Sequence, residues 1–250
     1  MKETLELLPS KQPWRPERPR AFSRPELLLI GVNGLFSDPP APVDDLVDGE
    51  VHVWWTRLEQ HRHDIDDFIE ILSPDERMRA GGYHFDRDRM RFIVRRALLR
   101  IILARYLGLS PGKLQFDYGP CGKPEIHCVG GLPLSFNLSH ADGFAVFAVT
   151  AEGTLGVDVE RIRPLQDIPA IAKRFLPAEE ANSISHLTGH AQLEYFLRCW
   201  TRKEALAKAT GQGIAEALDS DRHLQHAGAW SFRTFTPAPG YVGTLATGVA

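Results

Sequence analysis

The sequence predicts an α+β fold with two similar halves, each a long helix packed on a small, mainly antiparallel sheet. Apolar residues recur with helical periodicity in two long stretches, residues 86–108 and 191–211. Shorter stretches of alternating apolar and polar residues accompany each of them, as in strands with one buried face. The chain has 250 residues, of which 43% are hydrophobic, so it can bury a sizeable core.

The composition divides the chain into three parts. Residues 1–48 hold many of the prolines, which disrupt helices and strand ladders, and we expect an extension there. Within it, residues 26–36 could add one strand. Residues 49–150 form the expected N-terminal half and residues 151–250 the C-terminal half.

The N-terminal half opens with an alternating strand pattern at residues 50–58. Ser73 and Glu76 then have the spacing of a capping box at a helix start. The long helix 86–108 ends at Gly108, a residue suited to the left-handed conformation that terminates helices. Its apolar stripe comprises Met90, Val94, Ala97, Leu98, Ile101 and Leu107, and we expect Arg89, Arg95, Arg96, Arg100 and Arg105 to form a solvated face.

Strand patterns dominate the segment that follows this helix. Residues 132–140, 144–150 and 155–160 alternate or are apolar, and short Asp-Gly and Glu-Gly turns separate them. We expect these three strands to pair as an antiparallel meander. Residues 168–176 form another expected helix, and residues 230–247 an expected terminal hairpin.

Composition also narrows the functional class. The net charge of -3 gives no support for nucleic-acid binding, and no apolar run reaches the ~18 residues of a membrane span. The first residues lack the apolar core of a secretion signal, so we expect a cytoplasmic protein. Three cysteines form no Cys-x-x-Cys pair, and four histidines fit no metal-ligand spacing and are expected at the surface. These histidines are His52, His61, His63 and His84.

Two carboxylates interrupt an otherwise apolar strand. Asp158 and Glu160 are two residues apart, so their side chains project from the same face. Like charges this close raise each other's pKa unless a cation neutralises them. Alternatively, the strand end meets water and Arg161 and Arg163 supply the positive charge.

Charged residues also continue the apolar stripe of the second long helix. Leu193, Phe196, Leu197 and Trp200 form the expected stripe, and one and two turns further along are Glu204 and Lys208. The alternative is an ordinary Glu–Lys pair on a solvated helix face. Together, Asp158, Glu160 and Glu204 provide the hard oxygen donors that suit Mg²⁺ bound to a phosphorylated substrate, with Mn²⁺ also possible.

These residues lie in two motifs, "GVDVE" at Gly156–Glu160 and "WTRKEALAK" at Trp200–Lys208. Upstream are "GKPEI" at Gly122–Ile126 and "FNLSH" at Phe136–His140. In this order the four motifs resemble those of the 4′-phosphopantetheinyl transferase superfamily, in its surfactin-type branch. The resemblance extends from about residue 50 to the C-terminus and implies the fold of that family, as a monomer.

The resemblance implies transfer of the phosphopantetheine arm of coenzyme A to a serine of an acyl or peptidyl carrier protein, with release of adenosine 3′,5′-bisphosphate. Asp158 and Glu204 match metal ligands, and Glu160 matches a third acidic position. We expect Glu204 to take the serine proton and Lys208 to stabilise or protonate the departing phosphate.

Coenzyme A also carries phosphates and an adenine that need cations and contact surfaces. The resemblance implies that Ser139 and His140 contact the 3′-phosphate and nucleotide, and that Lys203 reaches the pyrophosphate. The remaining matches for coenzyme A binding are Arg79, Arg91, Lys123 and Asp158.

The expected partner is an acidic carrier protein. Residues 161–180 mix basic and apolar side chains that could dock an acidic, partly apolar helix, although an ordinary connector helix would have the same pattern. Two other functions stay open: a metal-dependent hydrolase of nucleotide pyrophosphates and a non-catalytic coenzyme A-binding protein. An intact Glu204 and Lys208 disfavour the second, because binding alone needs no base.

Overall fold

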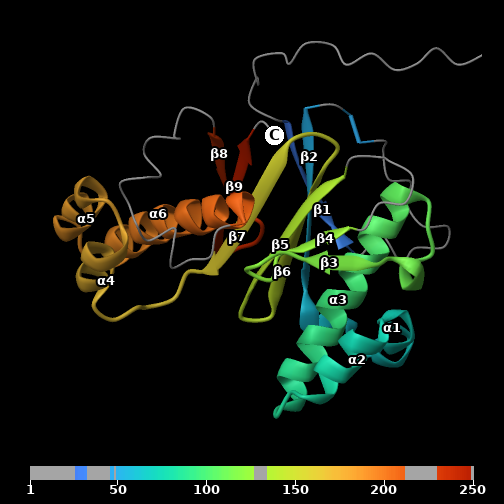
Figure 1. Cartoon of the computed structure of the whole chain (residues 1–250). Coiled ribbons are helices and arrows are strands. Elements are labelled where there is room, and N and C mark those ends of the chain that lie inside the picture. Colours follow the sequence, from blue (N-terminus) through green and yellow to red (C-terminus); the bar gives the residue numbers. More distant parts are fainter. Residues whose placement is uncertain (1–25, 33–45, 48, 127–133, 212–229, 249–250) are drawn as a thin grey trace, which may run out of the picture.

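Two sheets stacked face to face form the centre of the structure, and a long helix covers the outer face of each (Figure 1). The computed structural model describes residues 26–32, 46–47, 49–126, 134–211 and 230–248. Most of the expected extension, residues 1–48, and Cys128 lie outside these ranges. The layers follow the order helix, sheet, sheet, helix, which agrees with the α+β class predicted from the sequence.

The first sheet has four strands in the order β1-β2-β6-β5. Strand β1 (Glu26–Gly31) is the strand expected within the N-terminal segment, and it pairs in parallel with β2 (Glu50–Arg57). The other pairs are antiparallel. Strands β5 (Ser135–Ala141) and β6 (Phe144–Thr150) meet at a tight turn in which a non-glycine residue, Asp142, has a φ of 45°.

The second sheet has three antiparallel strands in the order β7-β9-β8. Strands β8 (Trp230–Phe235) and β9 (Tyr241–Gly248) confirm the terminal hairpin. The prediction of a three-stranded meander is wrong, because β7 (Thr154–Arg161) pairs with β9 and not with β6. A strand has only two edges for hydrogen bonding, and β2 and β5 already occupy both edges of β6. The short turn after β6 therefore folds β7 across the face of the first sheet.

The two halves repeat one topology. Each has a strand, two short helices, a 22-residue helix and an antiparallel strand pair whose second strand lies in the middle of the sheet. The first half also contains a small hairpin of β3 (Phe116–Tyr118) and β4 (Pro124–Ile126). The helices are α1 (Ile65–Ile71), α2 (Pro74–Gly81) and α3 (Asp86–Leu107), then α4 (Ile168–Phe175), α5 (Ala178–Ser185) and α6 (Gly189–Thr210).

Alternation of side chains along the strands places apolar residues on both faces of the first sheet. One face of β6, with Ala145, Phe147 and Val149, packs against α3. The opposite face, with Val146, packs against β7 of the second sheet through Val157. Because both faces are buried, β6 is apolar along its whole length, as its sequence indicates.

The edges of the two sheets meet at β5 and β7. Side chains of β5 satisfy backbone groups of β7: the N–H of Val157 donates to Asn137 Oδ1 (3.0 Å), and the N–H of Val159 to Ser139 Oγ (3.3 Å). Buried backbone N–H groups need such partners. The alternating polar residues of "FNLSH" therefore join the two halves.

Helix α6 lies very close to β7. A Cβ atom at Gly156 would come within 2.1 Å of the Ala205 carbonyl oxygen and 2.4 Å of the Ala209 nitrogen. Small residues on both elements permit this approach, which brings the next side chains along each element together. The capping box at Ser73 and the left-handed Gly108 (φ 63°) are also confirmed.

Two histidines and two arginines expected at the surface are buried. His52 is 1% exposed and its Nδ1 lies 2.7 Å from the Tyr106 hydroxyl, while His61 lies 2.9 Å from the Thr56 hydroxyl. His63 and His84 are exposed, as expected. Polar partners on neighbouring elements, which a count of sequence spacing does not reveal, make burial of these rings possible. The two arginines are Arg96 and Arg100, both paired with Glu76.

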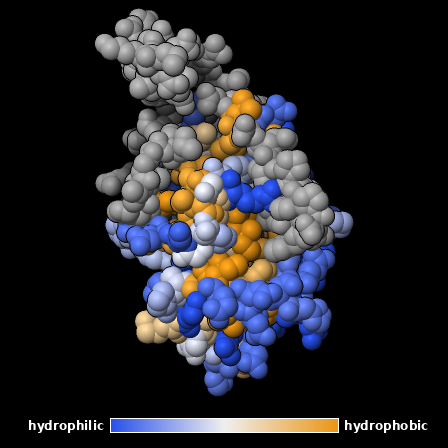
Figure 2. Space-filling model, turned by 90° about the vertical axis from the view of Figure 1, so that its right-hand side faces the viewer, coloured by the Kyte–Doolittle hydropathy of each residue, from blue (hydrophilic) through white to orange (hydrophobic). Residues whose placement is uncertain are grey.

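The face that carries α1, α2 and α3 is mixed in character. Figure 2 shows an apolar band through its centre and hydrophilic residues over its lower part. None of the described helices is long and apolar enough to cross a membrane.

The close approach of α6 to β7 leads to a stability prediction. Gly156→Ala should lower the free energy of unfolding by about 3 kcal/mol, because backbone atoms of α6 occupy the space of the new methyl group. Urea unfolding measures this change. Gly81→Ala is the matched control, since no atom lies within 4 Å of its added Cβ. Equal stability of the two variants would contradict this packing of α6 on β7.

Candidate active site

Asp158 is the central buried charge of the structure. It lies on β7, facing α6, and is 4% exposed. Its Oδ1 accepts hydrogen bonds from Lys208 Nζ (2.7 Å) and from Ser139 Oγ (2.8 Å). The Lys208 ammonium also donates to Ser139 Oγ (2.8 Å). Three elements, β5, β7 and α6, therefore converge on one carboxylate, and Lys208 supplies a positive charge beside it.

The sequence also allowed a strand end exposed to water and a Glu–Lys pair on a solvated helix face, and neither matches these contacts. Arg161 and Arg163 pair with Asp142 in the β5–β6 turn and not with Asp158. Glu204 is 9% exposed, and the ammonium of Lys208 contacts the strand carboxylate on the neighbouring element. The charged continuation of the α6 stripe is thus an inward-facing feature.

Two more carboxyl groups lie in the field of Asp158. Burial and the charge of Asp158 raise the pKa of Glu160 to about 7. Burial and Asp158 also raise the pKa of Glu204. Each shift reflects the cost of ionising a carboxyl group that is largely buried beside another carboxylate.

The donor set fits a hard divalent cation. Within the described ranges, Asp158 Oδ2 is buried and has no hydrogen-bond partner. Burying a carboxylate oxygen without a partner costs free energy, and a cation bound to this oxygen would offset that cost. Among the same residues, no three His, Cys, Asp or Glu side chains form a preassembled metal cluster. Mg²⁺ commonly completes its coordination with phosphate oxygens and water.

A cleft of about 360 Å³ opens beside the acidic group. Its wall combines cations with aromatic rings, a combination that suits a phosphorylated nucleotide. Glu204 and Lys208 lie at the end nearest Asp158 in this lining. The other charged and aromatic residues of the wall are Arg79, Phe92, Arg95, Arg96, Tyr118 and Lys123.

Cations crowd together on this wall. Burial, together with Arg96 and Arg79, lowers the pKa of Arg95 to about 10. The pKa of His140 falls to about 4, because protein atoms surround part of its ring and because Arg95, Lys208 and Arg91 repel a proton. His140 keeps an exposed edge. This unbalanced positive charge indicates a binding site for an anion.

Comparison with known proteins identifies the family. Residues 154–242 match the model of the 4′-phosphopantetheinyl transferase superfamily, and residues 55–152 match that of the N-terminal part of a 4′-phosphopantetheinyl transferase. The chain is 37% identical over 217 residues to the 4′-phosphopantetheinyl transferase HetI of Nostoc sp., covering 83% of this chain and 92% of that protein. The chain belongs to the 4′-phosphopantetheinyl transferase superfamily.

Other relatives agree with this assignment. A putative 4′-phosphopantetheinyl transferase of Synechocystis sp. is 38% identical over 60% of this chain and 61% of that protein. The 4′-phosphopantetheinyl transferase psf-1 of Bacillus pumilus is 32% identical over 64% of this chain and 66% of that protein. The resemblance inferred from the motifs is confirmed, and the chain is an enzyme of this transferase class.

Four of the predicted site residues line the cleft of this transferase: Arg79, Lys123, Glu204 and Lys208. The others are not part of its lining: Arg91, Ser139, His140, Asp158, Glu160 and Lys203. Lys123 reaches across the cleft, and its Nζ donates to the carbonyls of Leu155 (3.4 Å) and Ala209 (3.3 Å). Burial lowers its pKa. Lys203 Nζ donates to the Phe175 carbonyl at the end of α4. This bond ties α4 to α6, and burial lowers the pKa of Lys203.

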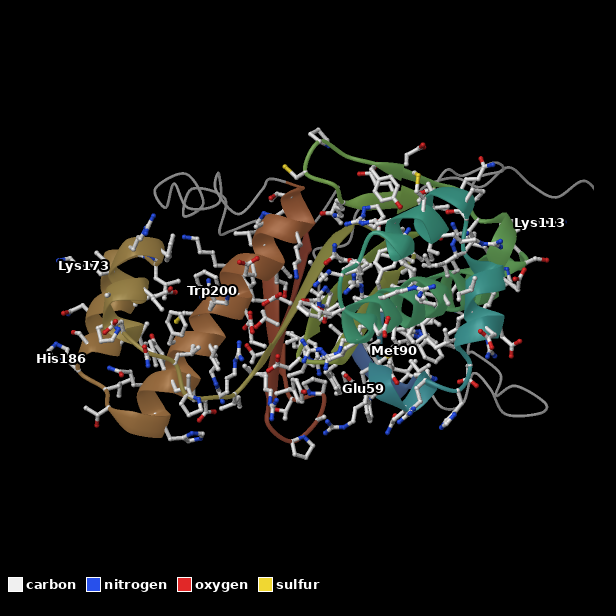
Figure 3. The ribbon with its side chains drawn as sticks, turned by 90° about the horizontal axis from the view of Figure 1, so that it is seen from below. Glu59, Met90, Lys113, Lys173, His186 and Trp200 are labelled. Carbon is white, nitrogen blue, oxygen red and sulfur yellow. The ribbon has the colours of Figure 1, made fainter. Side chains whose placement is uncertain are left out.

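The two expected phosphate-binding arginines have different surroundings. Arg91 is paired with Glu59, its Nε lying 2.7 Å from Oε1, beside the β5–β6 turn. A Cβ at Gly143 in that turn would come within 2.4 Å of the Glu59 carboxylate. Figure 3 labels Glu59 below Met90, a residue of α3. Arg79 lies over the Phe92 ring at 5.5 Å and lines the cleft.

Sequence reasoning missed four charged or aromatic residues of the cleft wall: Phe92, Arg95, Arg96 and Tyr118. The sequence predicts Arg95 on a solvated face, but Arg95 lines the cleft, and its charge helps to lower the pKa of His140. Its position four residues after Arg91 places both on one helix face, and this spacing could have revealed it. Tyr118 lies in a short strand outside all four motifs, and no sequence signal marked it.

The depressed pKa of His140 can be tested by NMR titration. In the free enzyme, its imidazole should be neutral at pH 7 and take up a proton only near pH 4. Adding adenosine 3′,5′-bisphosphate should move the pKa upward, because phosphate charge offsets the neighbouring cations. A pKa that stays fixed or falls on addition of the bisphosphate would show that the phosphates bind elsewhere.

Proposed function

We propose that this transferase moves the 4′-phosphopantetheine arm of coenzyme A to a serine hydroxyl of a carrier protein and releases adenosine 3′,5′-bisphosphate. The observation that supports this most directly is the continuity of the cleft. A wall of cations and aromatic rings leads to Glu204 and Lys208, beside the buried carboxylate of Asp158. A pyrophosphate placed at that junction would have cations on one side and a potential base on the other.

The proposed metal is Mg²⁺, with Mn²⁺ as an alternative of similar ligand preference. Asp158, Glu160 and Glu204 would hold it, and when bound it would neutralise phosphate charge and stabilise the leaving group. The partnerless Oδ2 of Asp158 and the raised pKa values of Glu160 and Glu204 support this donor set.

The protein groups have distinct proposed roles in the transfer. The serine oxygen forms a bond to the phosphorus that carries the pantetheine arm, and the bond from this phosphorus to the bridging oxygen breaks. Glu204 takes the serine proton, directly or through water, because its carboxylate lines the cleft beside Lys208. Lys208 stabilises or protonates the bisphosphate that leaves.

The other expected site residues bind the nucleotide end of coenzyme A in this proposal. His140 and Arg91 face the 3′-phosphate, and Ser139 holds Asp158 and Lys208 in place through its hydroxyl. Lys123 would exchange its backbone carbonyl partners for the nucleotide. Arg79 and Arg95 complete the cationic wall, and Lys203 lies near enough to Glu204 for their charges to interact.

The proposed carrier-binding surface begins directly after the acidic strand. Arg161 and Arg163 have 54% and 63% exposed side chains, and α4 adds Lys173 and Arg174. Figure 3 shows Lys173 on α4 at the outer end of the molecule, with Trp200 on the side of α6 that faces this helix. These cations suit the acidic helix of a carrier protein. A cytoplasmic monomer remains the expectation.

A mass measurement tests the proposal. The enzyme, coenzyme A, Mg²⁺ and an apo carrier protein are incubated, and the carrier is weighed by mass spectrometry. The wild type should add one phosphopantetheine group. Bisphosphate release without modification of the carrier would instead show a hydrolase, and binding of coenzyme A without turnover would show a non-catalytic protein.

Replacing the proposed base gives a sharper result. Glu204→Gln should lower kcat for transfer by about 10²-fold or more, because no group then accepts the serine proton. The dissociation constant of coenzyme A should change little. Glu194→Gln is the control, since Glu194 lies on the same helix but is exposed and paired with Arg198. Near-wild-type turnover of Glu204→Gln would remove Glu204 from this role.

A further inference from the structure

The β3–β4 hairpin forms one wall of the cleft and connects both halves of the protein. Tyr118 and Lys123 of this hairpin region line the cleft. Lys123 reaches the second half through the carbonyls of Leu155 and Ala209. On the other side, the Tyr118 hydroxyl accepts a hydrogen bond from Arg96 Nη2 at 2.8 Å.

A buried charge network holds Arg96 in place. Glu76 is 2% exposed, and it accepts hydrogen bonds from Arg96 Nε (2.7 Å), Arg100 Nε (2.7 Å) and the backbone N–H of Ser73 (3.0 Å). Burial alone would raise the pKa of Glu76, but the bond from Arg100 and the charge of Arg96 bring it below its usual value. Glu76 is therefore ionised and fully partnered.

The same arginines also hold the start of the hairpin. The guanidinium groups of Arg96 and Arg100 lie 4.8 Å and 5.1 Å from the centre of the Phe116 ring, two residues before Tyr118. Arg100 donates to the Leu114 carbonyl at 2.8 Å. The network thus fixes both the backbone before Tyr118 and the Tyr118 hydroxyl, although Tyr118 as a residue is 46% exposed.

The two aromatic rings of the described cleft wall differ in what they can bind. Phe92 is 2% exposed, and the guanidinium groups of Arg79 and Arg95 lie over it. Its ring is therefore closed to a ligand. Tyr118 is 46% exposed and has a fixed hydroxyl. The Arg96 guanidinium lies over its ring, 5.9 Å from the ring centre, so a base would stack on the face away from Arg96, next to the cations that line the cleft. An aromatic face next to phosphate-binding cations is the arrangement that stacks a nucleobase.

We propose that Tyr118 is the stacking surface for the purine of the nucleotide substrate, and that Arg96 and Glu76 are positioning residues that fix its ring. This inference rests on the proposed function, because it assigns the purine end of the coenzyme A that the function requires. The reacting pyrophosphate lies at the other end of the cleft, beside Lys208 and Glu204. Changes at Tyr118 should therefore affect nucleotide affinity and leave the chemical step alone.

The test compares three probes by calorimetry. Coenzyme A contains both ends of the substrate, adenosine 3′,5′-bisphosphate only the nucleotide, and 4′-phosphopantetheine only the arm. Tyr118→Ala should weaken binding of the first two by about tenfold, in the range of base–aromatic stacking, and leave the third unchanged. The kcat of Tyr118→Ala at saturating coenzyme A should stay within about twofold of the wild type, while its KM for coenzyme A should rise.

Conservative variants test the positioning residues. Tyr118→Phe keeps the ring but loses the bond to Arg96, and it should weaken bisphosphate binding by about threefold. Glu76→Gln should raise KM by a similar factor and leave kcat unchanged. Circular dichroism checks that this variant folds. Because Tyr118 is exposed, Tyr118→Phe tests the hydrogen bond even if the Glu76 variant does not fold. Tyr195→Ala, an exposed tyrosine on α6 outside the cleft wall, is the control.

Two results would overturn the inference. One is bisphosphate binding by Tyr118→Ala at the level of the Tyr195→Ala control. The other is an equal loss for 4′-phosphopantetheine, which would show a general distortion of the cleft. The proposed function fails separately, if the wild type does not modify a carrier protein, and the bisphosphate titrations still decide the role of Tyr118 in that case.

Discussion

The buried carboxylate of Asp158 is the constraint on which the rest of the site depends. A carboxylate with 4% exposure needs positive charge and hydrogen bonds, and these come from Lys208 and Ser139, which both donate to its Oδ1. These partners belong to different elements, so the requirement fixes the position of α6 relative to both sheet edges. Gly156 makes the arrangement possible, because only a residue without a side chain lets α6 come this close to β7.

The repeated topology places one cleft between the two halves. The first half contributes the arginines of α3 and the hairpin with Tyr118 and Lys123, and the second half contributes Glu204 and Lys208 of α6. Asp158 of β7 is hydrogen-bonded to Lys208. Burial, reinforced by neighbouring like charges, raises the pKa values of Glu160 and Glu204 and lowers those of Arg95 and His140. A ligand with phosphates and a divalent cation would offset both effects.

Local periodicity predicted the two long helices and the strands of the two larger sheets, but not the short strands β3 and β4. For Glu204 and Lys208 it allowed both an inward position and a solvated ion pair. Contacts between elements distant in sequence were not predictable in this way. The burial of Arg96 and Arg100 depends on Glu76, which belongs to a different helix, and periodicity cannot distinguish a solvated arginine from one with a buried partner. The pairing of β7 with β9 joins strands about 85 residues apart, whereas turn patterns favour the nearest neighbour. The motifs supplied most of the site residues, but they could not show that Lys203 is bonded to α4.

The most direct test of the central role of Asp158 is a double-mutant cycle between Asp158 and Lys208, with the free energy of unfolding measured in urea. Lys208→Met alone should lose about 3 kcal/mol, because it leaves a buried carboxylate without its cation. Asp158→Asn alone should cost little, because the Lys208 side chain is 30% exposed and its ammonium can reach water. The double variant should be about 2 kcal/mol more stable than the sum of the two single losses, and this difference is the coupling energy between the two side chains. If the losses of the two single variants simply add in the double variant, the Asp158 carboxylate does not depend on Lys208. That result would contradict the central role of this buried charge.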